Sequence, residues 1–369
     1  MSSSNYNQFR AMLAITKASM KAMFKNPSSV GFSIGFPLIF ILVFGFIGGS
    51  GPSVSFALVN NTDTSNLVVQ HLLKNPLVQL EKEKDTTILR EDLEKGRIAA
   101  TLSVDSVRSP VGFTQYTVHT QTSSASRDKF RILRSALAQV QAIAVEKGIP
   151  AQYQPIIVNE LPPVPARDYK MIDFILPGML GFSLLSAAVF GTAFLFFNLR
   201  QQLVLKRFFA TPISKAHIVF GECLARVLFQ LIAAVVIVVV GKYGFQFTLV
   251  HGWITFFEMA ILSLWGLIVF MGAGFVVSNL AKTESVIPLF ANILTLPQFL
   301  LSGTFFRIDV FPDWLQKFCR VLPLTQLNEA MRNISFEGAH LTDCWQQMGI
   351  LTLWGIAIYA IAVKVFKWE

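Results

Sequence analysis

The sequence LRQQLVLKRFFATPIS at residues 199–214 indicates how the whole chain is arranged. This segment is basic, contains no acidic residue, and separates two long apolar runs at residues 174–197 and 218–240. A positively charged loop between two membrane spans is expected to face the cytoplasm. Its apolar residues, among them the pair Phe208 and Phe209, predict a helix that lies against another surface. We therefore expect a cytoplasmic helix between two spans, where it can receive force from a soluble partner.

The composition supports a membrane protein. Hydrophobic residues make up 53% of the chain and charged residues only 14%, whereas about 25% of the residues in a soluble domain are charged. The net charge of +9 is concentrated before the first apolar run and in the central loop, while residues 49–173 are nearly neutral. Positive charge in alternate loops is typical of membrane topology, so nucleic acid is not an expected partner.

Six apolar stretches are each long enough to cross a hydrocarbon core about 30 Å thick. They are residues 31–48, 174–197, 218–240, 253–279, 286–303 and 347–366. With a cytoplasmic N-terminus, six crossings return the C-terminus to the cytoplasm. The sequence therefore predicts a polytopic α-helical membrane protein with six transmembrane helices. Our expected location for such a multi-pass protein is the bacterial cytoplasmic (inner) membrane.

Two further regions precede or interrupt these spans. Residues 1–30 mix basic and apolar residues, which predicts an amphipathic helix in the cytoplasmic interface, with a disordered basic tail as the alternative. Residues 49–173 predict a large extracytoplasmic α/β domain between the first and second spans. Its expected elements are strands at residues 54–59 and 113–120, helices at 65–73 and 127–146, a helix that stops at Gly96 before a strand within 89–103, and a stiff linker at 161–165.

The remaining residues, 174–369, are expected to contain five further transmembrane helices, a cytoplasmic coupling loop at residues 198–217 and an outer re-entrant hairpin at residues 304–346. Pro312, Pro323 and Gly338 are expected to break the hairpin into short helices, because proline and glycine end helical segments. Non-helical backbone at membrane depth needs protein neighbours to satisfy its polar groups. We therefore expect two copies, or one copy and a close relative, about a two-fold axis.

No pattern in the sequence points to catalysis. There is no Gly-rich stretch that would hold ATP phosphates, and no His-Glu-x-x-His or Gly-x-Ser-x-Gly motif. The five histidines are scattered, so no metal site is expected. We predict no catalytic residues, metal or cofactor in this chain, so that any energy from ATP must come from another polypeptide. Cys319 and Cys344 fall outside the predicted spans, and their pairing in an oxidising compartment stays open.

Polar residues inside two predicted spans are candidates for a translocation path. Glu222, Arg226 and Gln230 share one helical face because they follow at i, i+4 and i+8. Asn292 and Gln298 lie in the fifth predicted span. Ionisable groups in a span usually face the bundle interior or a water-filled path. The alternative for Glu222 and Arg226 is that they reach the lipid headgroups from a position near the interface.

Three stretches resemble the permease subunits of type-2 ABC exporters: the amphipathic N-terminal helix that leads into a span, LKRFFATPIS at residues 205–214, and residues 300–333. The last stretch is the most specific, with LLSGTFFRIDVFPDWLQ followed by LPLTQLNEAMRN. Its signature residues are Ser302, Gly303, Phe306, Pro312, Trp314, Leu315, Pro323, Leu324, Thr325, Glu329 and Arg332. The chain departs from the family at residues 201–204, where members often carry acids, and at Arg307, where a proline often stands.

The resemblance implies a membrane permease subunit of an ATP-driven exporter, driven by a separate cytosolic ABC ATP-binding subunit. It implies that the central loop is a coupling helix on that subunit, through Arg200, Lys206, Arg207, Phe208, Phe209, Thr211 and Pro212. The alternative is that the basic residues only set topology. The resemblance also implies the outer hairpin, with Ser302, Gly303, Pro323, Thr325, Glu329 and Arg332.

The expected substrate is an amphiphilic or lipid-like molecule or drug that leaves the cytoplasm or the inner leaflet. The insert at residues 49–173 exceeds a simple loop and suggests an extracytoplasmic adaptor as a further partner. A different class of function is a membrane sensor or mechanotransmitting protein that couples this domain to a cytoplasmic partner. An intramembrane enzyme would need paired catalytic polar residues in the spans, and none is evident in the sequence.

Overall fold

The computed structural model describes residues 7–47, 54–59, 66–75, 77–81, 86–94, 96, 98–108, 114–146, 156–164, 170–201, 213–308 and 311–365. The chain divides into two compact units. The membrane unit comprises Met1–Ile47 and Met171–Glu369, and the inserted unit comprises Gly48–Lys170. The inserted unit covers nearly the same residues as the predicted α/β domain, and its location outside the cytoplasm stays a prediction.

A mixed β-sheet forms the centre of the inserted unit. In the described residues its strand order is β2-β1-β3-β4-β5, with β3 and β4 antiparallel and the other neighbours parallel. The strands are β1 (Val54–Leu58), β2 (Val78–Leu80), β3 (Thr101–Arg108), β4 (Thr114–Gln121) and β5 (Ile156–Glu160). The strands predicted within residues 54–59, 89–103 and 113–120 are confirmed, whereas β2 and β5 were not predicted.

Helices cover both faces of this sheet. Successive strand residues point to opposite faces, so Phe56 packs in the core with α4 (Leu67–Lys74) and α6 (Arg127–Glu146), while Ala57 packs with α5 (Thr86–Glu94). The stiff linker expected at residues 161–165 begins instead as an extension of the sheet. Leu161 N donates to Thr120 O at 2.9 Å and Val164 N donates to Thr122 O at 2.8 Å.

Among the described residues of the membrane unit, five helical segments are long and apolar enough to cross a membrane: Met171–Gln201, Ala216–Phe245, Trp253–Leu280, Glu284–Leu301 and Trp345–Lys364. The helices in them are α7 (Met171–Gln201), α9 (Lys215–Phe245), α10 (Trp253–Leu280), η4 (Glu284–Val286) with α11 (Ile287–Leu301), and α14 (Trp345–Val365). They correspond to five of the six predicted spans, which confirms a polytopic helical membrane unit.

The first predicted span is less regular. Helical structure continues from Pro27 to Ile47 through α2 (Pro27–Val30), the π-helix η1 (Gly31–Gly35) and α3 (Phe36–Ile47). The apolar helical part of this segment, Ser33–Val43, is shorter than the five spans. A six-span topology therefore stays a prediction.

Short helices follow α11, as predicted for the hairpin at residues 304–346. They are α12 (Asp313–Val321), α13 (Pro323–Arg332) and η6 (Asn333–Glu337). Pro312 precedes α12, Pro323 opens α13, and Gly338 ends η6 with a φ of 79°, so the three predicted breaks are confirmed. Cys319 and Cys344 are both buried free thiols, not a disulfide.

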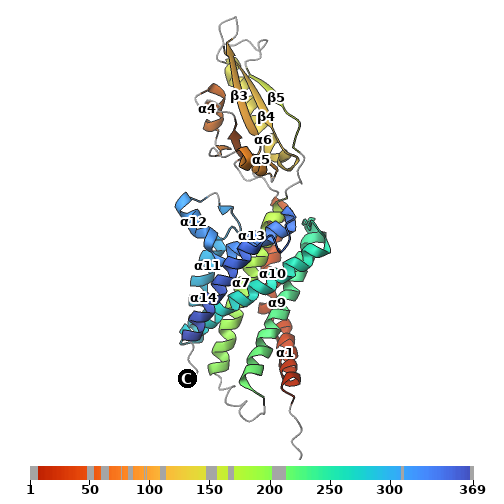
Figure 1. The fold of residues 1–369 in the computed structure, drawn as a ribbon, viewed down its shortest axis with the longest axis vertical. Coiled ribbons are helices and arrows are strands. Elements are labelled where there is room, and N and C mark those ends of the chain that lie inside the picture. Colours follow the sequence, from red (N-terminus) through yellow and green to blue (C-terminus); the bar gives the residue numbers. More distant parts are fainter. Residues whose placement is uncertain are drawn as a thin grey trace, which may run out of the picture. The chain divides into compact units, whose positions relative to one another are not determined.

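Two ends of the membrane unit are distinguished below (Figure 1). The α1 end contains the N-terminal helix α1 (Gln8–Lys25), the last turn of α7 and the start of α9. The hairpin end contains α12 and α13. The candidate functional residues fall mainly at these two ends.

Candidate functional site

Helix α1 runs side by side with the first half of α9 (Figure 1). Four residue pairs join the two helices, and their members are separated by 203 to 206 positions, so the helices are parallel. The pairs are Gln8–Ser214, Thr16–Gly221, Ser19–Glu222 and Phe24–Phe229. Helix α1 thus packs along the first half of α9, a candidate membrane span, and its predicted location in the cytoplasmic interface stays a prediction.

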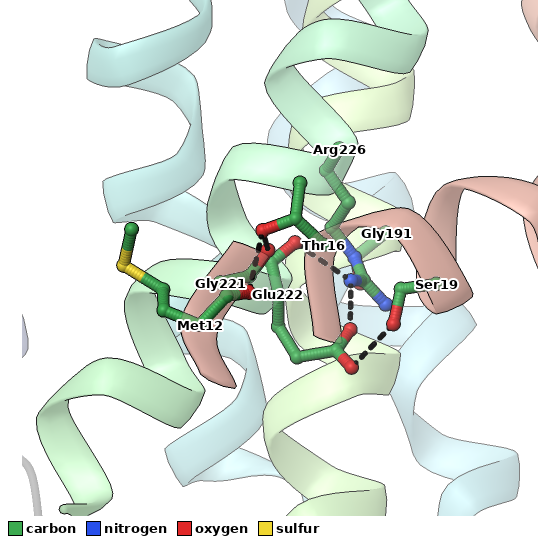
Figure 2. Close-up of polar contacts among 7 residues, drawn as sticks. All are labelled: Met12, Thr16, Ser19, Gly191, Gly221, Glu222 and Arg226. Carbon is green, nitrogen blue, oxygen red and sulfur yellow. Dashed lines mark hydrogen bonds and ion pairs between the residues drawn. The ribbon is translucent and has the colours of Figure 1, made fainter. Parts of the chain in front are cut away.

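A small residue on α9 allows this close packing. The Thr16 hydroxyl, on a residue only 4% exposed, lies 3.0 Å from Met12 O and 3.0 Å from Gly221 O, and its single hydrogen is shared between these two carbonyls (Figure 2). A Cβ atom at position 221 would lie 2.9 Å from Met12 O. Glycine at this position therefore lets the two backbones approach closely enough for Thr16 of α1 to reach a carbonyl of α9.

An ion pair extends this contact to a third helix. Arg226 Nη1 lies 2.8 Å from Glu222 Oε2, and Ser19 Oγ of α1 donates to Glu222 Oε1 at 2.6 Å (Figure 2). Arg226 Nε donates to Gly191 O of α7 at 3.1 Å. The side chains are only 18% and 20% exposed, and their charges cancel, which suits a position within a helical bundle. The predicted intrahelical pair is confirmed.

Gln230 continues the same face one turn further along α9. Its Nε2 donates to Ser183 Oγ of α7 at 2.9 Å, and Ser183 Oγ donates to Ser33 O of the π-helix η1 at 2.8 Å. Gln230 is 2% exposed, and its Oε1 accepts no hydrogen bond from the described residues. The predicted face Glu222–Arg226–Gln230 thus contacts α1, α7 and η1 of the same chain. We call these contacts, with Ser19, Gly191 and Ser183, the polar seam.

The other two path candidates lie elsewhere. Asn292 is exposed on α11. Gln298 Oε1 accepts from Leu324 N at 3.3 Å, and its Nε2 donates to Leu294 O at 3.2 Å, so Gln298 supports the start of α13. The structure does not bring these residues together with the polar seam, and a shared translocation path stays a prediction.

The predicted hairpin residues meet around Arg332. Arg332 Nη2 donates to Gly303 O at 2.6 Å and to Phe174 O at 3.0 Å, and the guanidinium lies 3.8 Å from the centre of the Phe174 ring. Gly303 adopts a φ of 67°, a region that favours glycine. Arg332 therefore joins the chain reversal after α11 to the first turn of α7.

Buried polar groups complete this cluster. Asn328 Nδ2 donates to Ser302 O at 3.2 Å and to Thr304 Oγ1 at 3.3 Å. Thr325 Oγ1 donates to Cys319 O at 2.7 Å. Pro323 is the first residue of α13, and Glu329 lies on the same helix, where it is partly buried. The sequence reasoning missed Asn328 and Phe174, because no spacing rule marks a side chain that contacts a loop or a distant carbonyl.

The central loop is described only at its ends. Lys206, Arg207, Phe208, Phe209, Thr211 and Pro212 lie outside the described residues. Arg200, predicted to contact the ATP-binding subunit, instead donates from Nη2 to Ser278 O at 2.9 Å and to Ala281 O at 3.2 Å. These are the C-terminal carbonyls of α10, so the guanidinium contacts its own chain.

Comparisons with known proteins identify the family. The chain is 24% identical over 368 residues to ABC transporter G family member 20 of Dictyostelium discoideum, covering 95% of this chain and 50% of that protein. It is 22% identical over 202 residues to the probable multidrug ABC transporter permease YbhR of Escherichia coli strain K12, covering 53% of each. It is 25% identical over 197 residues to nodulation protein J of Rhizobium leguminosarum bv. trifolii, covering 53% of this chain and 72% of that protein.

The chain spans about half the length of the first two relatives. A match to the ABC-2 family of transporter proteins covers residues 27–364. This range includes the polar seam except Ser19 of α1, and it includes the Arg332 cluster. It confirms the resemblance inferred from residues 205–214 and 300–333. The chain therefore belongs to the ABC-2 family of transporter proteins.

Proposed function

We propose that the chain is the membrane permease subunit of an ATP-driven exporter that moves an amphiphilic or lipid-like substrate or drug out of the cytoplasm or the inner leaflet. Membership of the ABC-2 family supports the transporter class. The E. coli relative named a probable multidrug ABC transporter permease supports the permease role. Energy would come from a separate cytosolic ATP-binding subunit, which binds ATP and Mg.

The polar seam is the observation that carries this proposal. Helix α9 begins at Lys215, directly after the central loop, and its N-cap Ser214 is bound to Gln8 of α1. A displacement of the loop would therefore move α1 and the start of α9 together. Arg226 and Gln230 would pass that displacement to α7 through Gly191 and Ser183. A force applied at one loop thus reaches several helices through hydrogen bonds that are already in place.

The proposed topology places the α1 end and both termini in the cytoplasm and the hairpin end outside. Helix α11 leaves large apolar side chains exposed, namely Leu289, Ile293, Leu296 and Leu300. A second copy or a close relative would cover part of this surface, and lipid the rest. The inserted unit would lie outside the cytoplasm, where an adaptor could bind it.

Affinity purification from mildly solubilised membranes tests the partner. We expect the intact chain to recover an ATP-binding subunit, and the double variant Phe208→Asp with Phe209→Asp to lose it, because buried aromatic anchors dominate interfaces. The matched control, Gln201→Asp with Gln202→Asp, adds the same two charges to the loop and keeps the aromatic pair.

Equal recovery by both variants would contradict the coupling assignment. Recovery of a kinase or regulator in place of an ATP-binding subunit would favour the sensor function. Export that continues after deletion of residues 52–165 would contradict a role for an adaptor on the inserted unit.

A further inference from the structure

The two ends of the central loop are bound to different helices. Ser214 at its end is held by Gln8 of α1, at 2.9 Å from Ser214 N to Gln8 Oε1. Arg200 before its start is held by the C-terminus of α10. We propose that Arg200 is a positioning residue that carries movement of the loop to the turn between α10 and α11. This inference rests on the proposed function and assigns Arg200 a role other than contact with the ATP-binding subunit.

The chemical groups in this contact suit a residue that transmits movement from α7 to the end of α10. The last carbonyl groups of an α-helix have no partner within the helix, and a cation there also interacts favourably with the helix dipole. Helix α10 ends at Leu280 with Ala281 as its C-cap, and Arg200 Nη2 reaches both Ser278 O and Ala281 O. Arg200 Nη1 lies 3.5 Å from Asn279 Oδ1. The planar guanidinium thus contacts three residues at one helix end, Ser278, Asn279 and Ala281.

Ring packing supports the same contact from within the bundle. The rings of Phe196 on α7 and Phe275 on α10 have centroids 4.1 Å apart, and the Arg200 guanidinium lies 5.8 Å from the centre of the Phe197 ring. The C-terminal parts of α7 and α10 are therefore joined by both apolar and polar contacts. Movement of the end of α7 at Arg200 would therefore displace the end of α10 with it.

The turn after α10 connects this contact to the hairpin end. Only Ala281–Thr283 separate α10 from η4, and α11 follows η4 directly. Helix α11 is little buried within the chain, so few internal contacts oppose its displacement. It ends at Leu301, and the backbone carbonyls of the next two residues, Ser302 and Gly303, accept hydrogen bonds from Asn328 and Arg332. A path of bonded elements therefore runs from Arg200 through α11 to the hairpin.

Lysine cannot replace this contact fully. Its ammonium group is a compact point charge, whereas the guanidinium offers several donors in a fixed plane. Arg200→Lys would keep the charge at the end of α10 but would lose simultaneous contact with Ser278 O and Ala281 O. Arg200→Gln would lose both the charge and the plane. The two variants separate the geometric role from the electrostatic one.

The test is a pair of distance measurements by spin labelling in the complex with the ATP-binding subunit, in nanodiscs. The labels replace the exposed residues Lys17 of α1 and Lys282 of the α10–α11 turn, in a chain whose three cysteines are changed to serine. We expect the distance to change between the nucleotide-free state and the state trapped with ATP and vanadate. Arg200→Gln should lose at least half of this change, and Arg200→Lys should fall between Arg200→Gln and the unmodified residue.

Two controls make the result specific. Arg10→Gln removes a charge from the exposed face of α1 and should leave the distance change intact. A second label pair, at Lys17 and Lys242, reports whether α1 remains on α9, and it should give the same distance with Arg200 and Arg200→Gln. A purely structural role of Arg200 would alter this second distance as well, and that result would overturn the positioning role.

The outcomes distinguish the two proposals. A bound ATP-binding subunit with the same distance change in Arg200→Gln overturns the role of Arg200 and leaves the permease function standing. A bound subunit with no distance change even with Arg200 present also overturns it. Failure of every variant to bind an ATP-binding subunit overturns the proposed function and this inference together.

Discussion

Each end of the membrane unit contains an arginine that contacts several neighbouring segments, and the partners of the two arginines differ. At the α1 end, Arg226 pairs with Glu222 on its own helix, and the pair contacts α1 and α7 through single hydrogen bonds. At the hairpin end, Arg332 binds two backbone carbonyls and lies over the Phe174 ring. The Glu222–Arg226 pair has one hydrogen bond to α1 and one to α7, and each can be exchanged for another partner when a helix moves, whereas Arg332 binds Gly303 O of the chain reversal and Phe174 O of α7 at the same time. We therefore expect the α1 end to change during transport and the hairpin cluster to keep its geometry.

The largest effect is expected from Arg332→Met. This change removes the donors to Gly303 O and Phe174 O, and hydrogen bonds to charged groups contribute about 1.5–3 kcal/mol each. We expect the free energy of unfolding in detergent to fall by about 3 kcal/mol. Lys317→Met, on the exposed side of neighbouring α12, is the control and should be neutral. Equal free energies of unfolding for Arg332→Met and Lys317→Met would contradict the view that Arg332 holds the hairpin cluster in a fixed geometry.

A smaller effect is expected from Gly221→Ala at the α1 end. The added methyl group would lie 2.9 Å from Met12 O, and overpacking costs about 1–3 kcal/mol. We expect α1 to separate from α9, so that trypsin cleaves at Lys17 and Lys21 several times faster. The control is Gly244→Ala on the same helix, where the nearest atom would lie 4.0 Å from the new Cβ. Matching cleavage rates would contradict the close contact.

Glu222→Gln is expected to change coupling more than stability. The amide keeps the shape and the contact with Ser19, but it leaves Arg226 without its counter-charge. We expect a loss of about 1 kcal/mol in the free energy of unfolding, with a several-fold fall in ATP hydrolysis by the assembled complex. A double-mutant cycle with Ser19→Ala measures their coupling. Additive effects would show that α1 and the ion pair act independently.

The least disruptive test measures how fast the thiol of Cys344, at the hairpin end, reacts with maleimide. Burial raises the pKa of its thiol to about 11, and the charges of Asp343, Glu258 and Glu337 act in the same direction. The reactive form is the thiolate, so at pH 8 only about one molecule in a thousand is reactive. We expect the maleimide reaction to be slow and to accelerate about tenfold per pH unit up to pH 10. An exposed cysteine introduced by Lys317→Cys should react rapidly at pH 8.

Much of the fold could be predicted because apolar runs are dictated by the membrane. Five predicted spans agree with the observed helices to within a few residues, and the helix predicted at residues 127–146 has the observed bounds. Strand β2 was missed because three residues carry too little pattern, and β5 was missed because most of its residues are exposed, so that it lacks the apolar alternation of β1. Short strands are fixed by their neighbours in the sheet, which local sequence does not reveal.

The candidate site was predictable only where its contacts are local. The spacing of Glu222, Arg226 and Gln230 predicted that they share one face of a helix, because helical periodicity alone determines which residues share a face. Ser19 and Gly191 could not be predicted, because they come from helices far away in sequence. Arg200 was predicted to face a partner, and only the structure shows that it reaches the end of α10.

The π-helix at Gly31–Gly35 has a consequence for how the chain would respond to the loss of a residue. A π-turn contains one residue more than the corresponding α-turn, and each residue of an α-helix rotates the following ones by about 100°. The rings of Phe36 and Phe40 now lie beside those of Phe182 and Phe305, at 5.6 and 5.4 Å. Deleting a single residue from residues 31–35 would restore a regular helix and turn both rings out of phase with these partners. This short segment therefore tolerates substitution more readily than a change of length.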